Sequence, residues 1–184
     1  MKRCSWLNLN NEKYVSYHDN EWGKKVYEDH KLYELLILEM FQAGLSWECI
    51  LNKRDYFKIS FDNFDINKIV NYDSKKVEEL LNNKNIIRNK RKIESTIINS
   101  KIFIEIQKEY KSFYNYINKY FNDEIVYEYD KTSSNISDLI SKDLQKRGMK
   151  FVGTKIIYSF LQATGFINSH EKGCYLYNGG KENE

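Results

Sequence analysis

The chain has 184 residues, of which 41% are hydrophobic and 30% are charged, and its formal net charge at pH 7 is +3. This length and composition exclude a disordered chain and predict one globular domain with a real core, or two small lobes that share a cleft. No apolar run is long enough to span a membrane, and residues 1–6 lack the apolar segment of a signal peptide, so we expect a cytoplasmic protein.

Helical periodicity dominates the chain after an irregular start of about 30 residues. We predict helices over 30–42, 46–59, 65–71, 75–83, 90–110, 112–121, 137–147 and 154–164. Residues 122–136 have the weakest helical pattern and are predicted to form a long crossing loop. The tail 178–184 is predicted to be mobile. The fold class is therefore all-α.

The helix predicted over 30–42 is apolar on nearly all sides, which is typical of a helix inside a domain. Glu39 shares one face of this helix with Leu32, Leu35 and Leu36. We expect it to be the single carboxylate that the helix carries into the interior. A satisfied core residue, or an acid that faces solvent at the helix end, is the alternative to a functional role.

A helix break follows directly after Glu39. Gly44 is predicted to end the first helix, and Ser46 is placed to cap the next one, which begins at Trp47. A buried acid beside a helix break and a tryptophan is therefore the feature that a functional interpretation must explain.

A second notable connection joins the helices predicted over 137–147 and 154–164. Gly148 and Gly153 flank hydrophobic residues there, and Lys150 lies between them. Glycine lets the backbone approach another chain closely, and the free N–H groups at the start of a helix favour an anion. The pattern predicts a seat for a DNA phosphate, with an ordinary glycine-terminated turn as the alternative.

Basic residues gather in two groups, although the net charge is modest. The groups are Lys84, Arg88, Lys90, Arg91 and Lys92, and Lys142, Lys146, Arg147, Lys150 and Lys155. Runs of charge are more often solvated faces than binding sites, so DNA binding does not follow from these groups alone.

Cysteine and histidine residues gather at the two ends of the chain. Cys4 and His18 lie near one end, and His170 and Cys174 lie near the other at a spacing that would place them on one side of a helical turn. The chain has three cysteines and no export signal, which argues against a disulfide framework. Such a set of nitrogen and sulfur donors suits a structural tetrahedral zinc ion, but the spacing matches no standard zinc finger, and buried cysteines with partly exposed histidines are the alternative.

Several segments together resemble the bacterial 3-methyladenine DNA glycosylase I family. The similar segments are 3–6, 17–23, 38–39 with 42–47, 86–93, 146–154 and 170–174. The similarity extends over essentially the whole chain and is weakest across 105–136. Ser5 and Met149 replace commoner family residues, proline is absent, and the crossing loop is shorter.

This resemblance implies an all-α helix-hairpin-helix glycosylase fold. Residues 1–184 would form one unit, with two helical lobes around a base-binding cleft and the hairpin near 148–153. The resemblance also implies one structural Zn²⁺ per chain that ties the two termini together. Its ligands would be Cys4, His18, His170 and Cys174. Cys49 has no place in that set and is expected to be buried structure.

The activity implied by the resemblance is hydrolysis of the N-glycosidic bond of 3-methyladenine in alkylated double-stranded DNA by a monomeric enzyme. Glu39 would be the catalytic residue: its carboxylate would accept hydrogen bonds from the flipped base and compensate its positive charge. An aromatic box would surround the base, formed by Trp6, Tyr14, Tyr17, Trp22 and Trp47. Gly148, Lys150 and Gly153 would hold DNA phosphates, and Leu45 would fill the vacated space in the stack, unless it is a core residue.

Two further points limit this interpretation. No aspartate occurs from Thr154 to Glu184, so the aspartate that many helix-hairpin-helix glycosylases carry after the hairpin is not assigned, and we expect a monofunctional enzyme. The alternatives are a glycosylase for another cationic alkylpurine, such as 7-methylguanine or 3-methylguanine, a non-catalytic DNA-binding module, and a zinc-stapled helical scaffold without a nucleic-acid partner.

Overall fold

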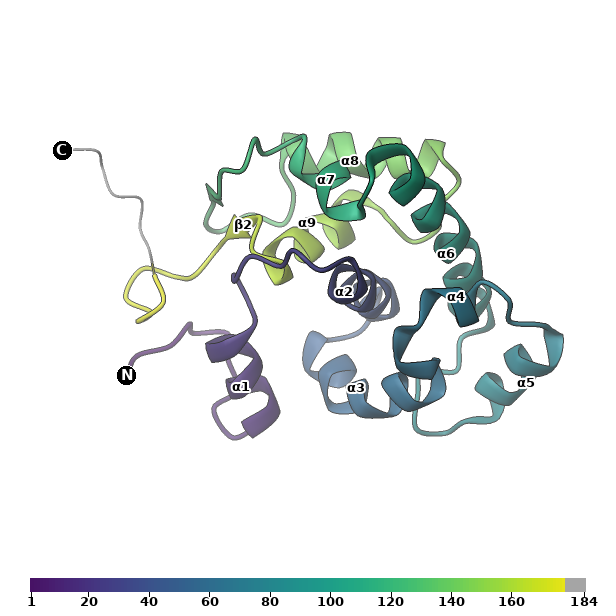
Figure 1. Ribbon diagram of the computed structural model, residues 1–184. Coiled ribbons are helices and arrows are strands. Elements are labelled where there is room, and N and C mark those ends of the chain that lie inside the picture. Colours follow the sequence, from purple (N-terminus) through teal and green to yellow (C-terminus); the bar gives the residue numbers. More distant parts are fainter. Residues whose placement is uncertain (178–184) are drawn as a thin grey trace.

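The computed structural model describes residues 1–177, and within them the chain is mostly helical (Figure 1). In chain order the elements are α1 (Glu12–Asn20), α2 (Asp29–Gln42), α3 (Trp47–Ser60), the 3-10 turn η1 (Asp62–Phe64), α4 (Ile66–Ile69), α5 (Ser74–Asn82), α6 (Lys90–Tyr110), α7 (Phe113–Asn118), β1 (Val126–Tyr127), α8 (Asn135–Lys146), α9 (Thr154–Ala163) and β2 (Ile167–Asn168). The two short strands pair in parallel, with Val126 beside Ile167. The tail 178–184, which was predicted to be mobile, lies outside the described residues. No helix in the described part is long and apolar enough to cross a membrane.

Each predicted helix overlaps an observed one, but the prediction of an irregular N-terminal region is wrong for residues 12–20, which form α1. Helix α1 forms there because the side chain of Asn11 accepts a hydrogen bond from the backbone N–H of Tyr14 at 3.3 Å and caps the first turn. Its polar composition hides the buried face, which consists of Tyr17 and His18. The crossing loop also contains β1, whose pairing with β2 no local pattern signals.

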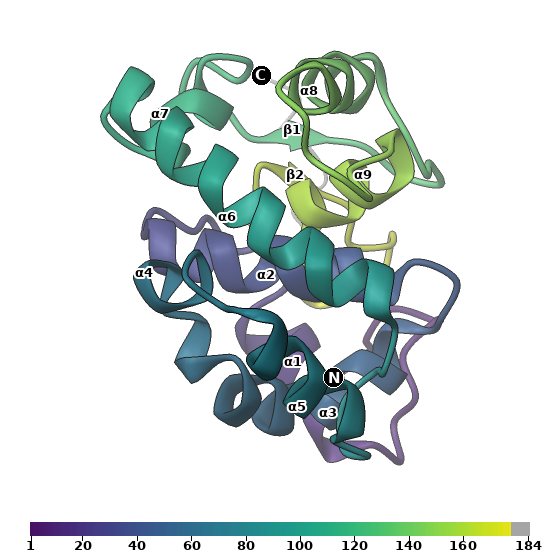
Figure 2. The same ribbon diagram turned by 90° about the vertical axis from the view of Figure 1, so that its right-hand side faces the viewer.

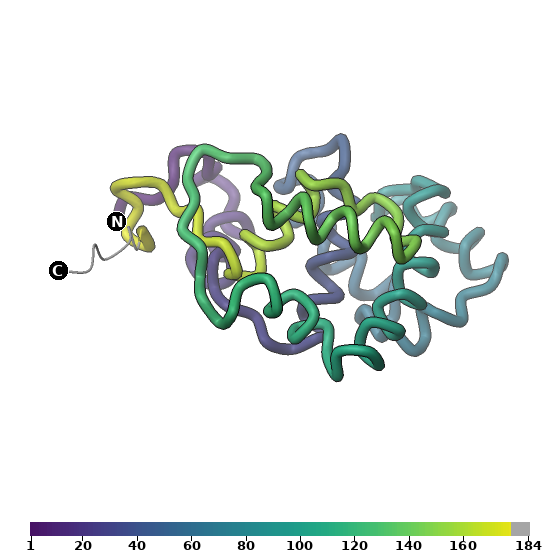
Figure 3. Tube along the Cα trace, turned by 90° about the horizontal axis from the view of Figure 1, so that it is seen from above, coloured from purple at the N-terminus to yellow at the C-terminus, as the bar shows by residue number. Residues whose placement is uncertain are grey.

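Helix α2 lies at the centre of the molecule. All its residues from Leu32 to Phe41 are buried, as its all-round apolar pattern predicts. Helices α1, α3 and α5 lie on one side of α2, and α8, α9 and the strands lie on the other, while α6 crosses α2 (Figure 2). Seen from above, the two ends of the described chain lie at the same end of the molecule (Figure 3). There the backbone N–H of Tyr175 donates to the carbonyl of Lys2 at 2.9 Å.

The connection between α2 and α3 follows the sequence prediction. Ala43 leaves the helical conformation, and Gly44 has φ +81°, in the left-handed region that favours glycine. The hydroxyl of Ser46 then accepts the backbone N–H of Cys49 at 3.2 Å and caps α3. Residue Cys49 itself is half-buried, so the expectation that it is buried is wrong.

Helix α2 carries two carboxylates into the interior, so the expectation of a single one is wrong. Glu34 and Glu39 are each 3% exposed. Glu34 accepts a hydrogen bond from the Nε of Arg54 at 2.7 Å and pairs with Lys31 at 3.2 Å. The partner that explains its burial lies on α3, which a periodicity argument along α2 does not reveal.

Two members of the predicted basic groups are not free cations on a solvated face. Lys92 is 5% exposed, and its ammonium donates to backbone carbonyls at the end of α2. Arg147 forms ion pairs with Glu109 at 2.6 Å and Asp143 at 3.0 Å. Within each group, position along the sequence therefore does not decide which cations can meet a phosphate.

Candidate active site and metal cluster

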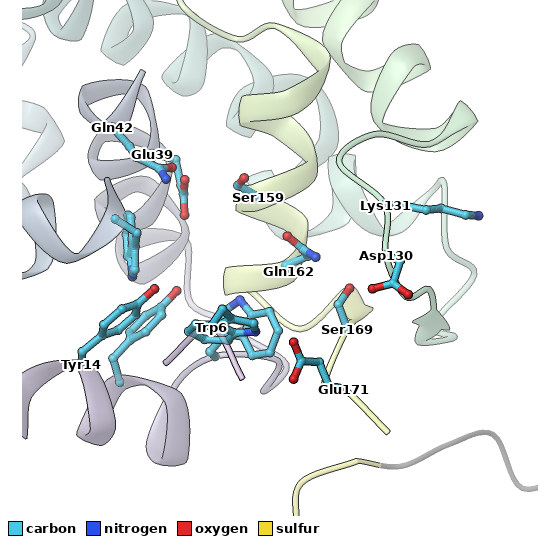
Figure 4. Close-up of a pocket in the computed structure, with 13 residues that line it drawn as sticks. Trp6, Tyr14, Glu39, Gln42, Asp130, Lys131, Ser159, Gln162, Ser169 and Glu171 are labelled. Carbon is cyan, nitrogen blue, oxygen red and sulfur yellow. The ribbon is translucent and has the colours of Figure 1, made fainter. Parts of the chain in front are cut away.

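A pocket of about 300 Å³ opens between α2, α9 and the segments around α1 (Figure 4). One wall is aromatic and contains every ring that the sequence assigned to base binding: Trp6, Tyr14, Tyr17, Trp22 and Trp47. Glu39 and Gln42 come from the last turns of α2 and point into the same space. The structure therefore brings the predicted acid and the predicted rings into one pocket.

The rings of the aromatic wall come from α1, from the segments before and after it, and from the start of α3. Tyr14 and Tyr17 are three residues apart on α1 and share a face of that helix. The ring of Trp47, at the start of α3, lies 5.2 Å from the ring of Tyr17 between centroids. Trp6 lies 5.5 Å from Tyr14 and 4.9 Å from Trp22, the latter nearly edge-to-face. Tilted and edge-to-face arrangements are the ones that aromatic pairs prefer, so the rings of this wall pack against one another while they line the pocket.

Glu39 is the acid at the inner end of the pocket. Burial raises the pKa of its carboxyl group to about 8, since the charged form loses its hydration there. Among residues 1–177, its Oε2 has no hydrogen-bond partner, and neither has the Nε1 of Trp47. Buried polar atoms are normally paired, and leaving one unpaired costs about 1–3 kcal/mol. Two unpaired groups that line one pocket therefore indicate a place where a ligand supplies the missing bonds.

The opposite wall is polar, and the sequence analysis did not find it. Its side chains come from α9, from the segment after β2 and from the crossing loop after β1: Ser159, Gln162, Ser169, Glu171, Asp130 and Lys131. One signal was available, because Ser159 and Gln162 are three residues apart and interrupt an otherwise apolar stretch of α9. The loop residues carry no such signal, since the β1–β2 pairing is what places them there.

A buried ion-pair network supports the aromatic wall from behind. The guanidinium of Arg54 donates to Glu34 at 2.7 Å and to both carboxylate oxygens of Glu21 at 2.9 Å. Burial alone would raise the pKa of Glu34, but the charge and hydrogen bond of Arg54 outweigh it and lower that pKa. The network joins α2 and α3 to the segment that follows α1, which carries Trp22.

The four predicted metal ligands come together from the two ends of the chain. All of them are buried, and their donor atoms lie within 4.8 Å of one another. The Sγ of Cys174 lies 3.6 Å from the Nε2 of His18 and 3.7 Å from the Nδ1 of His170, and the Sγ of Cys4 lies 3.6 Å from that same Nδ1. Tetrahedral zinc, with bonds of about 2.3 Å to sulfur and about 2.0 Å to nitrogen, separates such donors by about 3.6 Å. The donor set and its spacing therefore fit a metal ion of this kind.

The residues around the cluster orient its ligands. The Nδ1 of His18 lies 2.8 Å from Asp19, and Asp19 accepts two hydrogen bonds from Nε and one from Nη2 of Arg3. Carboxylates commonly fix a ligating imidazole in this way. The spacing argument assumed that His170 and Cys174 lie on one side of a helical turn. In the structure they face one another across a non-helical turn. Gly23 has φ +74°, and a Cβ there would lie 3.0 Å from the Nε2 of His170.

The cluster lies directly behind the aromatic wall of the pocket. The ring of Trp22 lies 4.6 Å from the ring of His170, and the ring of Trp6 lies 5.5 Å from the ring of His18. A metal held at the cluster would therefore fix the backs of two rings that line the pocket.

The predicted DNA-contact residues lie on two surface connections. Leu45 lies in the α2–α3 connection and is 41% exposed, which excludes the alternative that it is a core residue. In the α8–α9 connection Gly148 has φ +104°, and Gly153 precedes the first turn of α9, which has no side-chain cap in the described chain. Lys150 is exposed between them, while its backbone N–H and carbonyl are both bound by Asn99 at 2.8 and 2.9 Å.

The fold and pocket together define a mostly helical protein with an aromatic pocket around a buried acid. Comparison with known proteins agrees: the profile of the methyladenine glycosylase family matches residues 6–177. The chain is 38% identical over 187 residues to DNA-3-methyladenine glycosylase 1 of Escherichia coli (strain K12), an alignment that covers 98% of this chain and 100% of that relative.

Solved structures give the same result. A crystal structure of 3-methyladenine DNA glycosylase I matches with a TM-score of 0.91 at 37% identity, covering 96% of this chain and 100% of that one. The 3-methyladenine DNA glycosylase I of Staphylococcus aureus, solved for its recognition of 3-methyladenine, matches with a TM-score of 0.89 at 30% identity, covering 95% and 96%. The chain belongs to the methyladenine glycosylase family, as the resemblance of its motifs predicted.

Proposed function

We propose that this protein is a DNA repair enzyme that hydrolyses the N-glycosidic bond of 3-methyladenine in alkylated double-stranded DNA, releasing the base and leaving an abasic site. The observation that supports this most directly is Glu39, buried and unpaired within residues 1–177, in an aromatic pocket of a chain from this family. The activity is also the one that its relatives are named for.

The charge of the substrate explains why an acid and aromatic rings form the pocket. An adenine methylated at N3 is cationic while it is still attached to the sugar, which weakens the glycosidic bond and makes the base a better leaving group. A cation over an aromatic face gains about 0.5–2 kcal/mol per contact. Neutral adenine gains much less from the same rings, so the pocket selects by charge.

Glu39 would contact the base and change its protonation state on binding. With a pKa of about 8, the carboxyl group of the free enzyme is largely neutral at pH 7. A cationic purine within hydrogen-bond distance stabilises the carboxylate, lowers that pKa and releases the proton. The charge-assisted hydrogen bond then satisfies the oxygen that lacks a partner in the described chain.

Water would attack C1′ after the base departs. No aspartate occurs from Thr154 to Glu184 to activate that water, and no lysine–aspartate pair is available there for a lyase reaction. The segment after the hairpin therefore supplies no aspartate, and the carboxylates of Asp130 and Glu171 lie on the polar wall of the pocket. The chemistry that we propose depends on extrusion of the base, selection of its charge and departure of an activated leaving group.

The DNA would be held at the α8–α9 connection, in the manner of a helix-hairpin-helix module. Gly148, Lys150 and Gly153 would meet phosphates through the side chain of Lys150 and the uncapped N–H groups at the start of α9. Leu45, exposed on the connection between the pocket residues Gln42 and Trp47, would fill the space that the extruded base leaves.

Cys4, His18, His170 and Cys174 would hold one Zn²⁺ per chain. Because the four side chains close the coordination, the ion would be structural: it would join the two ends of the chain and supply no step of the reaction. The whole chain, 1–184, would then act as one unit, with two helical lobes around the base-binding cleft, as a monomer in the cytoplasm.

The decisive test is incubation of the protein with methylated duplex DNA and chromatographic identification of the released bases. Release of 3-methyladenine by the wild type, with release strongly reduced in Glu39→Gln and Glu39→Ala, is expected. Full excision by both variants would refute the role of Glu39. Release of 7-methylguanine or 3-methylguanine alone would mean that the enzyme acts on that base and not on 3-methyladenine. No release of any base would favour a non-catalytic DNA-binding module.

The metal is tested by elemental analysis of the purified protein. About one zinc per chain is expected. A protein that is fully folded and metal-free, with its four ligands accessible to added zinc but not binding it, would contradict the assignment.

A further inference from the structure

Helix α6 carries a lysine in its buried face whose ammonium group ends at the α2–α3 connection. Lys92 is 5% exposed, and its Nζ donates to the carbonyl of Phe41 at 2.8 Å and to the carbonyl of Ala43 at 2.6 Å. Lysine is rarely buried unless its charge is paired. Here two backbone carbonyls receive it, and burial lowers its pKa.

The same face of α6 also holds the α8–α9 connection. Asn99 lies two helical turns after Lys92 and is fully buried. Its side-chain oxygen accepts the backbone N–H of Lys150 at 2.8 Å, and its amide donates to the carbonyl of Lys150 at 2.9 Å. One helix face therefore binds the backbone of both connections that are placed to contact DNA.

We propose that Lys92 is a positioning residue for the reaction: it holds the α2–α3 connection, with Leu45 and Trp47, at a fixed place relative to the phosphate-binding connection that Asn99 holds. This inference rests on the proposed function, because it concerns how an extruded base and its DNA backbone are held at the same time.

The local structure explains why a cation is needed at this point. A helix leaves the carbonyls of its last turn without internal partners and carries partial negative charge at its C-terminus. Helix α2 has no basic residue in its last turn. Lys92 supplies both the hydrogen-bond donors and the charge from α6, so the helix can end inside the protein without unpaired carbonyls.

The two carbonyls that Lys92 binds lie on either side of Gln42, which lines the pocket. Glu39 lies one turn earlier, and Gly44 with φ +81° lies directly after. Without the ammonium group, the carbonyls of Phe41 and Ala43 would lose the hydrogen bonds that join the end of α2 and the following turn to α6. The exposed Leu45 and the ring of Trp47 would then shift relative to the bound DNA.

The test compares Lys92→Met with a matched control on the same helix. Thr96 is fully buried between Lys92 and Asn99, and its hydroxyl donates to the carbonyl of Lys92 within the helix at 3.0 Å. Thr96→Val therefore removes a buried hydrogen bond within α6 but no hydrogen bond from α6 to either connection. Thermal unfolding of each variant shows the general loss of stability, and excision is measured well below both midpoints.

Single-turnover excision of 3-methyladenine from duplex DNA separates binding from positioning. For Lys92→Met we expect the rate at saturating enzyme to fall about ten- to hundredfold, as small misplacements of reacting groups do. The enzyme concentration at half-saturation should stay unchanged, because the phosphate contacts remain. Thr96→Val should keep the wild-type rate. If Lys92→Met does not fold, Lys92→Gln is measured instead: its neutral, shorter side chain can donate to a carbonyl but carries no charge, so its loss of rate should be smaller. A rate below that of Thr96→Val at unchanged half-saturation then upholds the proposal, and a rate equal to that of Thr96→Val refutes it.

A double variant tests whether Lys92 acts through the connection that carries Leu45. We expect Lys92→Met to reduce excision less in a Leu45→Ala background than in the wild type, since residues that act as a unit are not additive. Equal excision rates for Lys92→Met and Thr96→Val would refute the positioning role of Lys92, and so would additive effects of Lys92→Met and Leu45→Ala. In either case the proposed glycosylase activity still stands, provided that the wild type releases 3-methyladenine. A wild type that releases no base would instead refute the proposed function.

Discussion

Two glutamates of the central helix α2 are equally buried but differ in their hydrogen-bond partners and in the direction of their pKa shifts. Glu34 and Glu39 are five residues apart on α2, and each is 3% exposed. Glu34 is bound by Arg54 at 2.7 Å, and although burial opposes ionisation, that guanidinium lowers its pKa. Glu39 has an oxygen without a partner in residues 1–177, and burial raises its pKa to about 8.

The difference shows that burial alone does not identify a functional acid. Two carboxylates can be equally buried in one helix and still differ in role. A cationic partner on a neighbouring helix makes one of them part of the fold, and the lack of such a partner leaves the other available to a ligand. Glu34 is satisfied by the chain itself, so its contribution appears in folding. Glu39 is left unsatisfied by the described chain, so its contribution should appear in binding and catalysis.

The largest loss of stability is expected when Glu34, the acid paired with Arg54, is changed. Glu34→Gln removes the negative charge that neutralises the buried Arg54 and should lower the free energy of unfolding by about 3 kcal/mol. This is the lower end of the range for a broken buried pair, because Glu21 still binds the guanidinium. Urea denaturation at pH 7 measures it. An unchanged unfolding free energy would mean that the pair does not stabilise the fold.

Glu39→Gln should show the opposite pattern. The unfolding free energy should stay the same or rise, because no ion pair is broken within the described structure. Excision of 3-methyladenine should fall about 10- to 100-fold, since the lost hydrogen bond to a charged group is worth about 1.5–3 kcal/mol. Glu34→Gln, measured while folded, is the matched control. Equal losses of excision in both variants would erase the distinction between the two acids.

The pH dependence of stability should also separate them. The ordinary pKa of glutamate is 4.5, and that of Glu39 in the folded protein is about 8. Between these values the folded state holds a proton that the unfolded state has lost, so the contribution of Glu39 falls as the pH rises and is constant above about 8. The lowered pKa of Glu34 has the opposite sign: its contribution is present above 4.5 and is lost on acidification.

The measurable quantity is the difference in unfolding free energy between the wild type and Glu39→Gln. Around neutral pH the value for the wild type minus that for Glu39→Gln should fall by up to about 1.4 kcal/mol per pH unit as the pH rises, because only the wild type loses stability through this group. Urea denaturation at several values between pH 5.5 and 8.5 gives this slope. A difference that does not change with pH would show that the carboxyl group of Glu39 titrates normally in the folded protein.

The sequence predicts this molecule best where a feature is local. The helix ends at Gly44 and Ser46 follow from the conformations and hydrogen bonds that these residues favour, and the structure confirms both. The burial of Glu39 follows from the apolar surface of its helix. Helix α1 was missed because a polar segment with two buried side chains gives a weak periodic signal.

The features that the sequence does not predict depend on partners from distant elements. Glu34 is buried because Arg54 reaches it from α3, and Lys92 is buried because the end of α2 lacks a cation of its own. The polar wall with Ser169 exists because β1 and β2 pair across the fold. Periodicity shows which side of a helix faces inward, but it does not show what meets that side.

The smallest expected effect concerns the ring next to Glu39. The ring of Trp47 lies 5.2 Å from Tyr17, and its Nε1 has no hydrogen-bond partner in the part of the chain that the structure describes. Trp47→Phe keeps an aromatic face but weakens its attraction for a cation by about 0.5–1 kcal/mol, so excision should fall only about two- to fivefold.

Stability should distinguish the two uses of this tryptophan. Because the indole N–H is unpaired within residues 1–177, Trp47→Phe breaks no hydrogen bond of the fold, and its unfolding free energy should fall less than that of Glu34→Gln. Urea denaturation and base release on one preparation compare the two losses. A large loss of stability with unchanged excision would make Trp47 a core residue like Phe41, and the selection of a cationic base would then depend on Glu39 and the remaining rings.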